Sequence, residues 1–296
     1  MNSINLYQPE TIRRLVYLDW NVIISMADGH FAEFRAALEE ANDKDNILVL
    51  FSATHVQEAD NITDQERAPE GLSGRRLRFL SELTRNTYLY NAGDQNSPSI
   101  RRQGPEDVRK ILKEVPFAKE LMHDIVNIFD LDQMKKNRDQ LQLNPNELNN
   151  IKPPGVIAQL DQIVYRKLSA LSPQLPPGFG VQQLLEMALK FYPNSSTLGI
   201  ESKMAAVFSA LNSLGFWPDN PKKTSSEAAF YDSMHAANAA LCYYFVTEDK
   251  ALRVKSLAVY EFFDIETRVI NIDVMMVKLN ELPHNLSVNR NGITGG

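Results

Sequence analysis

Residues 15–21 read Leu-Val-Tyr-Leu-Asp-Trp-Asn, and this stretch decides the fold. Its first four residues form a continuous apolar run without alternation, which is typical of a strand buried on both faces of a parallel sheet. Asp19 follows directly, so we expect it at the carboxyl end of that strand, the edge where open parallel sheets bind ligands. The stretch therefore predicts an α/β fold and places a candidate site residue in it.

Three further apolar runs are predicted strands, and helical patterns accompany them. The predicted strands are 47–51, 243–246 and 268–272, and the predicted helices are 31–41, 53–61, 225–241 and 251–263. Alternation of strands and helices favours a parallel sheet with right-handed crossovers. We therefore predict a parallel-sheet α/β/α sandwich.

A long segment without a strand pattern separates the two halves of the sandwich. Its helical patterns cover 74–90, 105–129, 155–171, 181–191 and 200–214, with Pro, Gly and Asn breakers between them. We predict a discontinuous α/β domain made of residues 1–61 and 225–285, with an all-helical insertion at 62–224. Residues 286–296 are predicted to be a disordered tail.

Composition limits the classes of function. The chain has 296 residues, 44% of them apolar and 23% charged, as in an ordinary globular protein with a full core. A net charge of −6 argues against a protein that coats nucleic acid by bulk attraction, although a local basic patch can still hold phosphates. The single cysteine, Cys242, excludes intrachain disulfides and suits a reducing cytosol. With no signal-peptide or membrane-span pattern, we predict a cytoplasmic protein without a membrane partner.

Three more acids are expected at the same edge as Asp19. Asp249 follows the predicted strand at 243–246, while Glu58 and Asp232 lie only about 9 Å into helices that begin beside the strands' carboxyl ends. Clustered carboxylates repel each other unless a cation lies between them. Mg²⁺ and Mn²⁺ prefer oxygen ligands, and they can activate water and polarise a phosphoryl oxygen. The four acids therefore predict a Mg²⁺ or Mn²⁺ site for phosphodiester hydrolysis.

Neighbouring polar residues are candidates for supporting roles. Those beside the acids are Asn21, Thr247 and His235, and the candidate phosphate contacts are Lys250, Arg253, Arg75, Arg76 and Arg78. Simpler roles stay open for all of them. The acids can cap helices, the arginines can line a solvated helix face, and His235 can be a structural histidine. In a functional role, His235 would bond Asp232 or contact a phosphate.

Four stretches together resemble the PIN-domain superfamily of nucleases. They are Val-Tyr-Leu-Asp-Trp-Asn at 16–21, Ser-Ala-Thr-His-Val-Gln-Glu at 52–58, the helix at 231–239, and Phe-Val-Thr-Glu-Asp-Lys-Ala-Leu at 245–252. The resemblance covers 14–61 and 225–282, and the long insertion has no counterpart in small PIN toxins. It implies an α/β/α fold with Asp19, Glu58, Asp232 and Asp249 as the metal site. It also implies RNA as the substrate, and an antitoxin or regulatory protein as a partner.

The residues and the resemblance together predict an endoribonuclease that acts on single-stranded or looped RNA, as a toxin or defence effector. The alternative is a catalytically weak PIN-like protein that binds nucleic acid or acts as a scaffold. A phosphatase of the haloacid-dehalogenase kind is disfavoured. Its second Asp acts as an acid, and Asn21 stands at that position here.

Overall fold

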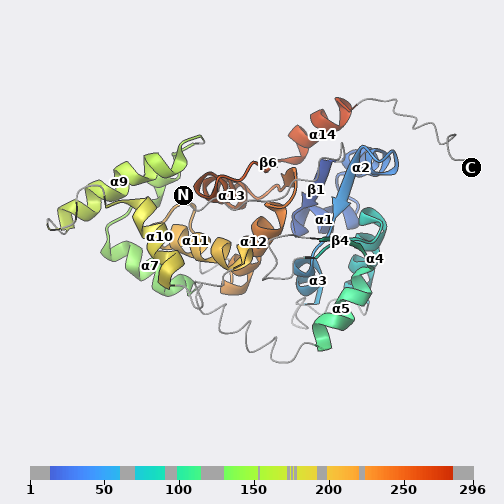
Figure 1. Cartoon of the computed structure of the whole chain (residues 1–296), viewed down its shortest axis with the longest axis horizontal. Coiled ribbons are helices and arrows are strands. Elements are labelled where there is room, and N and C mark those ends of the chain that lie inside the picture. Colours follow the sequence, from blue (N-terminus) through green and yellow to red (C-terminus); the bar gives the residue numbers. More distant parts are fainter. Residues whose placement is uncertain are drawn as a thin grey trace, which may run out of the picture.

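The computed structural model describes residues 14–60, 71–90, 99–114, 130–152, 154–171, 174, 176, 179–191, 199–219 and 224–282. The predicted tail at 286–296 lies outside these residues, as does the second half of the helix predicted at 105–129. Figure 1 shows a sheet with helices on one side of the molecule and a group of helices on the other, with α12 and α13 between them. Within the described ranges, every helix is too short or too polar to traverse a lipid bilayer.

Four parallel strands form the central sheet in the order β2-β1-β5-β6. The strands are β1 (Arg14–Leu18), β2 (Ile47–Leu50), β5 (Tyr244–Val246) and β6 (Arg268–Ile270). Leu18 pairs with Val246, so β1 and β5 end side by side. The parallel α/β architecture predicted from the apolar runs is confirmed.

The two faces of the sheet are buried in two separate cores because side chains alternate along each strand. On the first face of the sheet, Val16 and Leu18 point into one core, which they share with six helices. On the second face, Leu15 and Tyr17 point into the other core. The helices of the first face are α1 (Trp20–Ala27), α2 (Ala32–Asp43), α3 (Ala53–Asp60), α4 (Leu72–Thr84), α5 (Pro105–Glu114) and α14 (Ile272–Asn280). Burial on both faces explains why β1 has no polar residue between Leu15 and Leu18.

A hairpin occupies part of the segment that was predicted to be all helical. The helix predicted at 74–90 ends at Thr84, and β3 (Thr87–Tyr90) pairs antiparallel with β4 (Ser99–Arg102). Arg85 and Asn86 adopt left-handed conformations with φ of 53° and 58°, which ends the helix. The hairpin is a separate two-stranded sheet, and an isolated parallel bridge between Phe51 and Tyr88 joins it to the end of β2. The prediction that strands are absent between 62 and 224 is therefore wrong.

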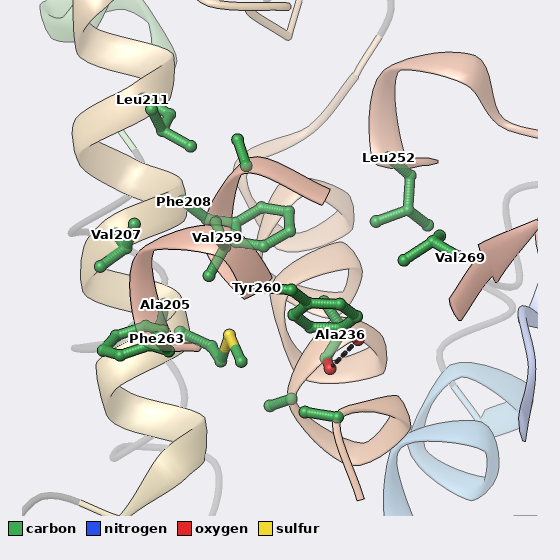
Figure 2. Close-up of a cluster of buried hydrophobic side chains, with 14 of the residues drawn as sticks. Ala205, Val207, Phe208, Leu211, Ala236, Leu252, Val259, Tyr260, Phe263 and Val269 are labelled. Carbon is green, nitrogen blue, oxygen red and sulfur yellow. Dashed lines mark hydrogen bonds between the residues drawn. The ribbon is translucent and has the colours of Figure 1, made fainter. Parts of the chain in front are cut away.

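The remaining helices of the long segment lie on the second side of the sheet, beyond two helices that cover it. They are α7 (Leu131–Gln140), α8 (Pro145–Leu148), α9 (Val156–Leu171), α10 (Val181–Phe191) and α11 (Ile200–Leu214), and they join α12 (Ser226–Ala239) and α13 (Lys250–Phe263). Figure 2 shows Phe208 of α11 among Val259, Tyr260 and Phe263 of α13. One continuous core therefore joins the helical segment to the sheet.

Glu261 of α13 caps the amino terminus of α9 across this junction. Its carboxylate accepts hydrogen bonds from the backbone N–H groups of Gly155 (3.0 Å), Val156 (3.0 Å) and Ile157 (3.4 Å). The first N–H groups of a helix have no partner inside the helix, so an acid there is stabilising.

Removing this cap is expected to destabilise the helical segment. Glu261→Ala should lower the free energy of unfolding by about 1–2 kcal/mol, which is typical for a lost helix cap. Urea unfolding followed by circular dichroism measures the change. Glu266→Ala, in the exposed loop after α13, is the matched control. An equal loss in both variants would show that the cap contributes nothing specific.

Candidate functional site

Asp19 lies at the carboxyl end of β1, as predicted, and its carboxylate is 1% exposed. Its N–H donates to the carbonyl of Val246 (2.9 Å), which ties it to the end of β5. The hydroxyl of Thr247, which is fully buried, donates to Asp19 Oδ2 (2.9 Å). The predicted supporting contact of Thr247 is therefore present, between residues that are 228 positions apart.

The environment of Asp19 makes its ionised form costly. Burial is the largest cause and, with the charges of Glu58 and Asp249, raises the pKa of Asp19 to about 6. The charge of His235 and the hydrogen bond from Thr247 oppose the rise. Asp19 is thus within electrostatic reach of two other predicted site acids.

Glu58 of α3 is held by a buried chain of hydrogen bonds. His235 Nε2 is hydrogen-bonded to Glu58 Oε2, and His235 Nδ1 to the hydroxyl of Tyr17 (2.9 Å). The Tyr17 hydroxyl also bonds Ser52 Oγ (2.7 Å). Burial lowers the pKa of His235, but the charges of Glu58 and Asp19 and the bond to Glu58 outweigh burial, so the pKa is raised overall. Of the roles left open for His235, the hydrogen bond to Asp232 is not formed, since its two ring nitrogens bond Glu58 and Tyr17.

Asp232 lies in α12 and is partly buried. Burial is the largest cause of a pKa well above the usual range of an aspartate, and the charges of Asp19 and Asp249 add to it. The carboxylate forms no hydrogen bond to another described residue. A carboxyl group in such a place, with no donor among the described residues, is unusual for a structural role.

Asp249 is the N-cap of α13 and is exposed. Its Oδ1 accepts from the N–H of Leu252 (2.8 Å), and its own N–H donates to Thr247 Oγ1 (3.1 Å). Helix capping, the simpler role left open by the sequence, is therefore present at this residue. The adjacent Glu248 points elsewhere and accepts from the N–H of Ile272 (2.6 Å) at the start of α14.

Several predicted supporting residues do not contact the acids. Asn21 is exposed in the first turn of α1, and its side chain forms no hydrogen bond to Asp19. The Lys250 ammonium lies 4.9 Å from the centroid of the Trp217 ring, and Arg253 Nη1 donates to the carbonyl of Thr247 (3.2 Å). The arginines of α4 that were predicted to contact phosphate are Arg75, Arg76 and Arg78. Arg75 and Arg78 are exposed, whereas the buried Arg76 Nε has no hydrogen-bond partner among the described residues.

The donor set fits a hard divalent cation by its chemistry. All four acids offer carboxylate oxygens, and Mg²⁺ is commonly held by one or two carboxylates with several waters retained. The side chains do not gather around one point, however. Among the described residues, no group of three or more His, Cys, Asp or Glu side chains is arranged to hold a metal ion. A metal ion at this edge would therefore be coordinated by few protein side chains and by several waters.

Sequence reasoning missed a second buried polar group beside the acids. Lys255 of α13 is fully buried and is hydrogen-bonded to Asp219 and Asn212. The signal was present, because Lys255 lies three residues after Leu252 and four before Val259, on the apolar face of the helix. A charged residue on such a face requires a buried partner.

Comparisons with known proteins returned no match: no family model, no curated protein and no solved structure is significantly similar to this chain. The fold and this edge define the class, which is a parallel α/β protein with a buried carboxylate, Asp19, at the carboxyl end of a central strand. Membership of the PIN-domain superfamily stays a prediction.

Proposed function

We propose that this protein is a metal-dependent endoribonuclease that hydrolyses phosphodiester bonds in single-stranded or looped RNA. The observation that carries the proposal is the buried Asp19 at the end of β1, bonded to Thr247 at the end of the neighbouring strand β5, with the charges of other acids acting on it and on Asp232 at this edge. These acids come from four different elements, and two of them have raised pKa values from burial and mutual repulsion. Such clusters of perturbed acids are typical of functional sites.

The roles of the residues follow from their contacts. A bound Mg²⁺ or Mn²⁺ would activate water and stabilise the developing charge on phosphate. Asp19, oriented by Thr247, and Asp232, which has no competing hydrogen bond to a described residue, would hold it. His235 fixes Glu58 at the same edge. Attack on phosphorus would leave a 5′-phosphate and a 3′-hydroxyl.

The choice of RNA, a toxin or defence role, an antitoxin partner and a cytoplasmic location rest on the resemblance and the composition. The direct test is incubation of the purified protein with labelled single-stranded RNA, single-stranded DNA and duplexes, with Mn²⁺, Mg²⁺ or EDTA. Metal-dependent cleavage of single-stranded RNA supports the proposal. No cleavage of any substrate would contradict it.

Trp217 is a candidate platform for an unpaired base. The backbone φ of Trp217 is 45°, which is a strained conformation for a bulky residue. The backbone N–H of Trp217 donates to Asn149 Oδ1 (2.6 Å). Its indole N–H is buried without a partner among the described residues, and Lys250, which follows the site acid Asp249, covers its ring. A partly buried aromatic ring beside a cation suits a stacked base next to a phosphate.

We therefore expect Trp217→Ala to weaken binding of single-stranded RNA. Loss of one stacked base costs about 1–3 kcal/mol, which is roughly 5- to 150-fold in affinity. Fluorescence anisotropy of a labelled oligonucleotide in EDTA measures binding without cleavage. Trp217→Phe keeps an aromatic face and should retain most of the affinity. Equal RNA affinity of the Trp217→Ala variant and the unaltered protein would show that Trp217 does not contact the RNA.

One observation favours the second candidate function, a nucleic-acid-binding or scaffold protein with little activity. Asp249 caps a helix and Glu58 is bound to His235, so two of the four acids already have structural partners. Titration of Mn²⁺ followed by melting temperature separates the two functions, because a ligand bound only by the folded state raises stability. No shift at millimolar Mn²⁺ would favour the scaffold.

A further inference from the structure

The hairpin of β3 and β4 presents a stacked arginine to solvent. The Arg101 guanidinium carbon lies 3.5 Å from the centroid of the Tyr90 ring, and Arg101 Nε donates to Ser99 Oγ (3.2 Å). These three side chains share one face of the hairpin, because Tyr90 is opposite Ser99 and side chains alternate along a strand. Arg101 is exposed, and its two terminal nitrogens have no hydrogen-bond partner among the described residues. It is therefore a cation held in one orientation, with donors available for a ligand.

The neighbouring Arg102 is bound within the protein instead. Its Nη1 donates to the Arg85 carbonyl (2.5 Å) and to Thr87 Oγ1 (3.0 Å). Charged residues on an edge strand such as β4 deter pairing with other chains. That role does not require a guanidinium that lies on a ring and is bonded through Nε. The geometry of Arg101 suits a phosphate, which two parallel N–H groups of one guanidinium can bind.

The strand register places the hairpin next to the edge that carries Asp19. Strands β1 and β2 are paired so that Phe51 is level with Leu18, the residue before Asp19. The parallel bridge from Phe51 to Tyr88 brings β3 to the same level. Adjacent strands are about 4.8 Å apart, so β3 lies about 10 Å from β1. Because β3 runs in the direction of β1, Tyr90 lies beyond the carboxyl edge of the sheet.

A second pair of an aromatic ring and a cation lies on the other side of this edge. Lys250 begins α13, the helix that follows β5, and its ammonium covers the Trp217 ring. The strand order is β2-β1-β5, with β3 bridged to β2, so the Tyr90–Arg101 and Trp217–Lys250 pairs bracket Asp19. From β3 to β5 the strands span about 14 Å. Proteins that bind single strands combine basic side chains for the backbone with aromatic rings for the bases.

We propose that Arg101, positioned by Tyr90 and Ser99, binds a backbone phosphate of a single-stranded RNA that crosses the edge from β5 towards the hairpin. This inference rests on the proposed function for the choice of RNA, and it requires no bound metal ion. The strand meets the Trp217–Lys250 pair on one side of the edge and Arg101 on the other. Because the chain has a net charge of −6, its attraction for RNA depends on local cations of this kind.

Binding in EDTA tests the inference without cleavage. Fluorescence anisotropy of a labelled single-stranded RNA gives the Kd of the full-length protein at several salt concentrations. We expect Arg101→Gln to weaken binding about tenfold, because hydrogen bonds to a charged group are lost. The slope of log Kd against log salt concentration should become shallower by about 0.7, the value for one phosphate contact to a single strand.

Two further variants separate lost charge from altered structure. Arg101→Lys keeps the charge and should keep the salt slope. Arg166→Gln is the matched control and should change neither affinity nor slope. Arg166 is exposed on α9, which lies at the opposite end of the molecule from β4 (Figure 1). Circular dichroism shows whether each variant is folded.

Each outcome decides between the two claims. A folded Arg101→Gln variant with the affinity and salt slope of the unaltered protein would overturn the phosphate contact and leave the proposed function standing. A loss of affinity with an unchanged slope would also overturn it, because no phosphate contact has then been removed. If the unaltered protein binds no RNA, the inference is wrong, and the cleavage assay with Mn²⁺ decides the proposed function separately.

Discussion

Asp232→Asn is expected to abolish Mn²⁺-dependent cleavage, with a loss of about 10³-fold or more in rate, as for other electrostatic groups at reacting centres. Asparagine has the same size but lacks the charge that would hold the ion. The Asp232 carboxylate forms no hydrogen bond to a described residue, and Lys255 keeps its bond to Asp219. The substitution therefore removes charge and leaves the packing of α12 in place.

Initial rates on a labelled single-stranded RNA with Mn²⁺ measure this loss. Circular dichroism and the melting temperature show whether the variant is folded. Asp273→Asn, an exposed acid in the first turn of α14, is the matched control and should cleave at the unaltered rate. Full activity of a folded Asp232→Asn variant would refute the assignment of Asp232.

Asp19→Asn is expected to stabilise the metal-free protein at neutral and alkaline pH while it removes activity. The pKa of Asp19 is raised from 3.8 to about 6, so the folded state binds this proton more tightly than the unfolded state does. The cost of ionisation is therefore absent below pH 4, grows between pH 4 and 6, and is complete above pH 6. It amounts to about 3 kcal/mol. Asparagine avoids this cost and can still accept the hydrogen bond from Thr247.

Denaturant unfolding at pH 8 and at pH 4 in EDTA tests this prediction. The variant should be more stable by up to about 3 kcal/mol at pH 8 and little different at pH 4. Saturating Mn²⁺ should narrow the gap, because at 100 times Kd a ligand adds about 2.7 kcal/mol to the protein that binds it. Asp28→Asn, at the exposed end of the same helix, should show no comparable dependence on pH. A variant less stable than the unaltered protein at pH 8 would falsify the burial argument.

Local sequence patterns were sufficient for most of the fold. The four apolar runs became the four parallel strands, and the helices predicted at 181–191 and 200–214 have the observed bounds. The hairpin at β3 and β4 was missed because the helical pattern of α4 runs into Thr-Tyr-Leu-Tyr without a Gly or Pro. Helix α4 instead ends before Arg85 and Asn86, which adopt the left-handed conformation that glycine usually provides.

The partners of the site residues were harder to predict than their positions. Asp19 and Thr247 were expected at one edge, and they are hydrogen-bonded there. A bond to Asp232 in its own helix was one of the roles left open for His235, yet His235 bonds Glu58, 177 residues away. Lys255 was not singled out at all, although it is fully buried and hydrogen-bonded to Asp219 and Asn212.

The sequence by itself determined the parallel sheet and the edge at which the acids lie, because apolar runs define buried strands and parallel strands end together. Only the tertiary structure decided that His235 bonds Glu58 and that Lys255 bonds Asp219. Those pairings join α12 to α3 and α13 to the loop after α11, so they depend on how elements far apart in the chain pack against one another. No local pattern of residues determines that packing.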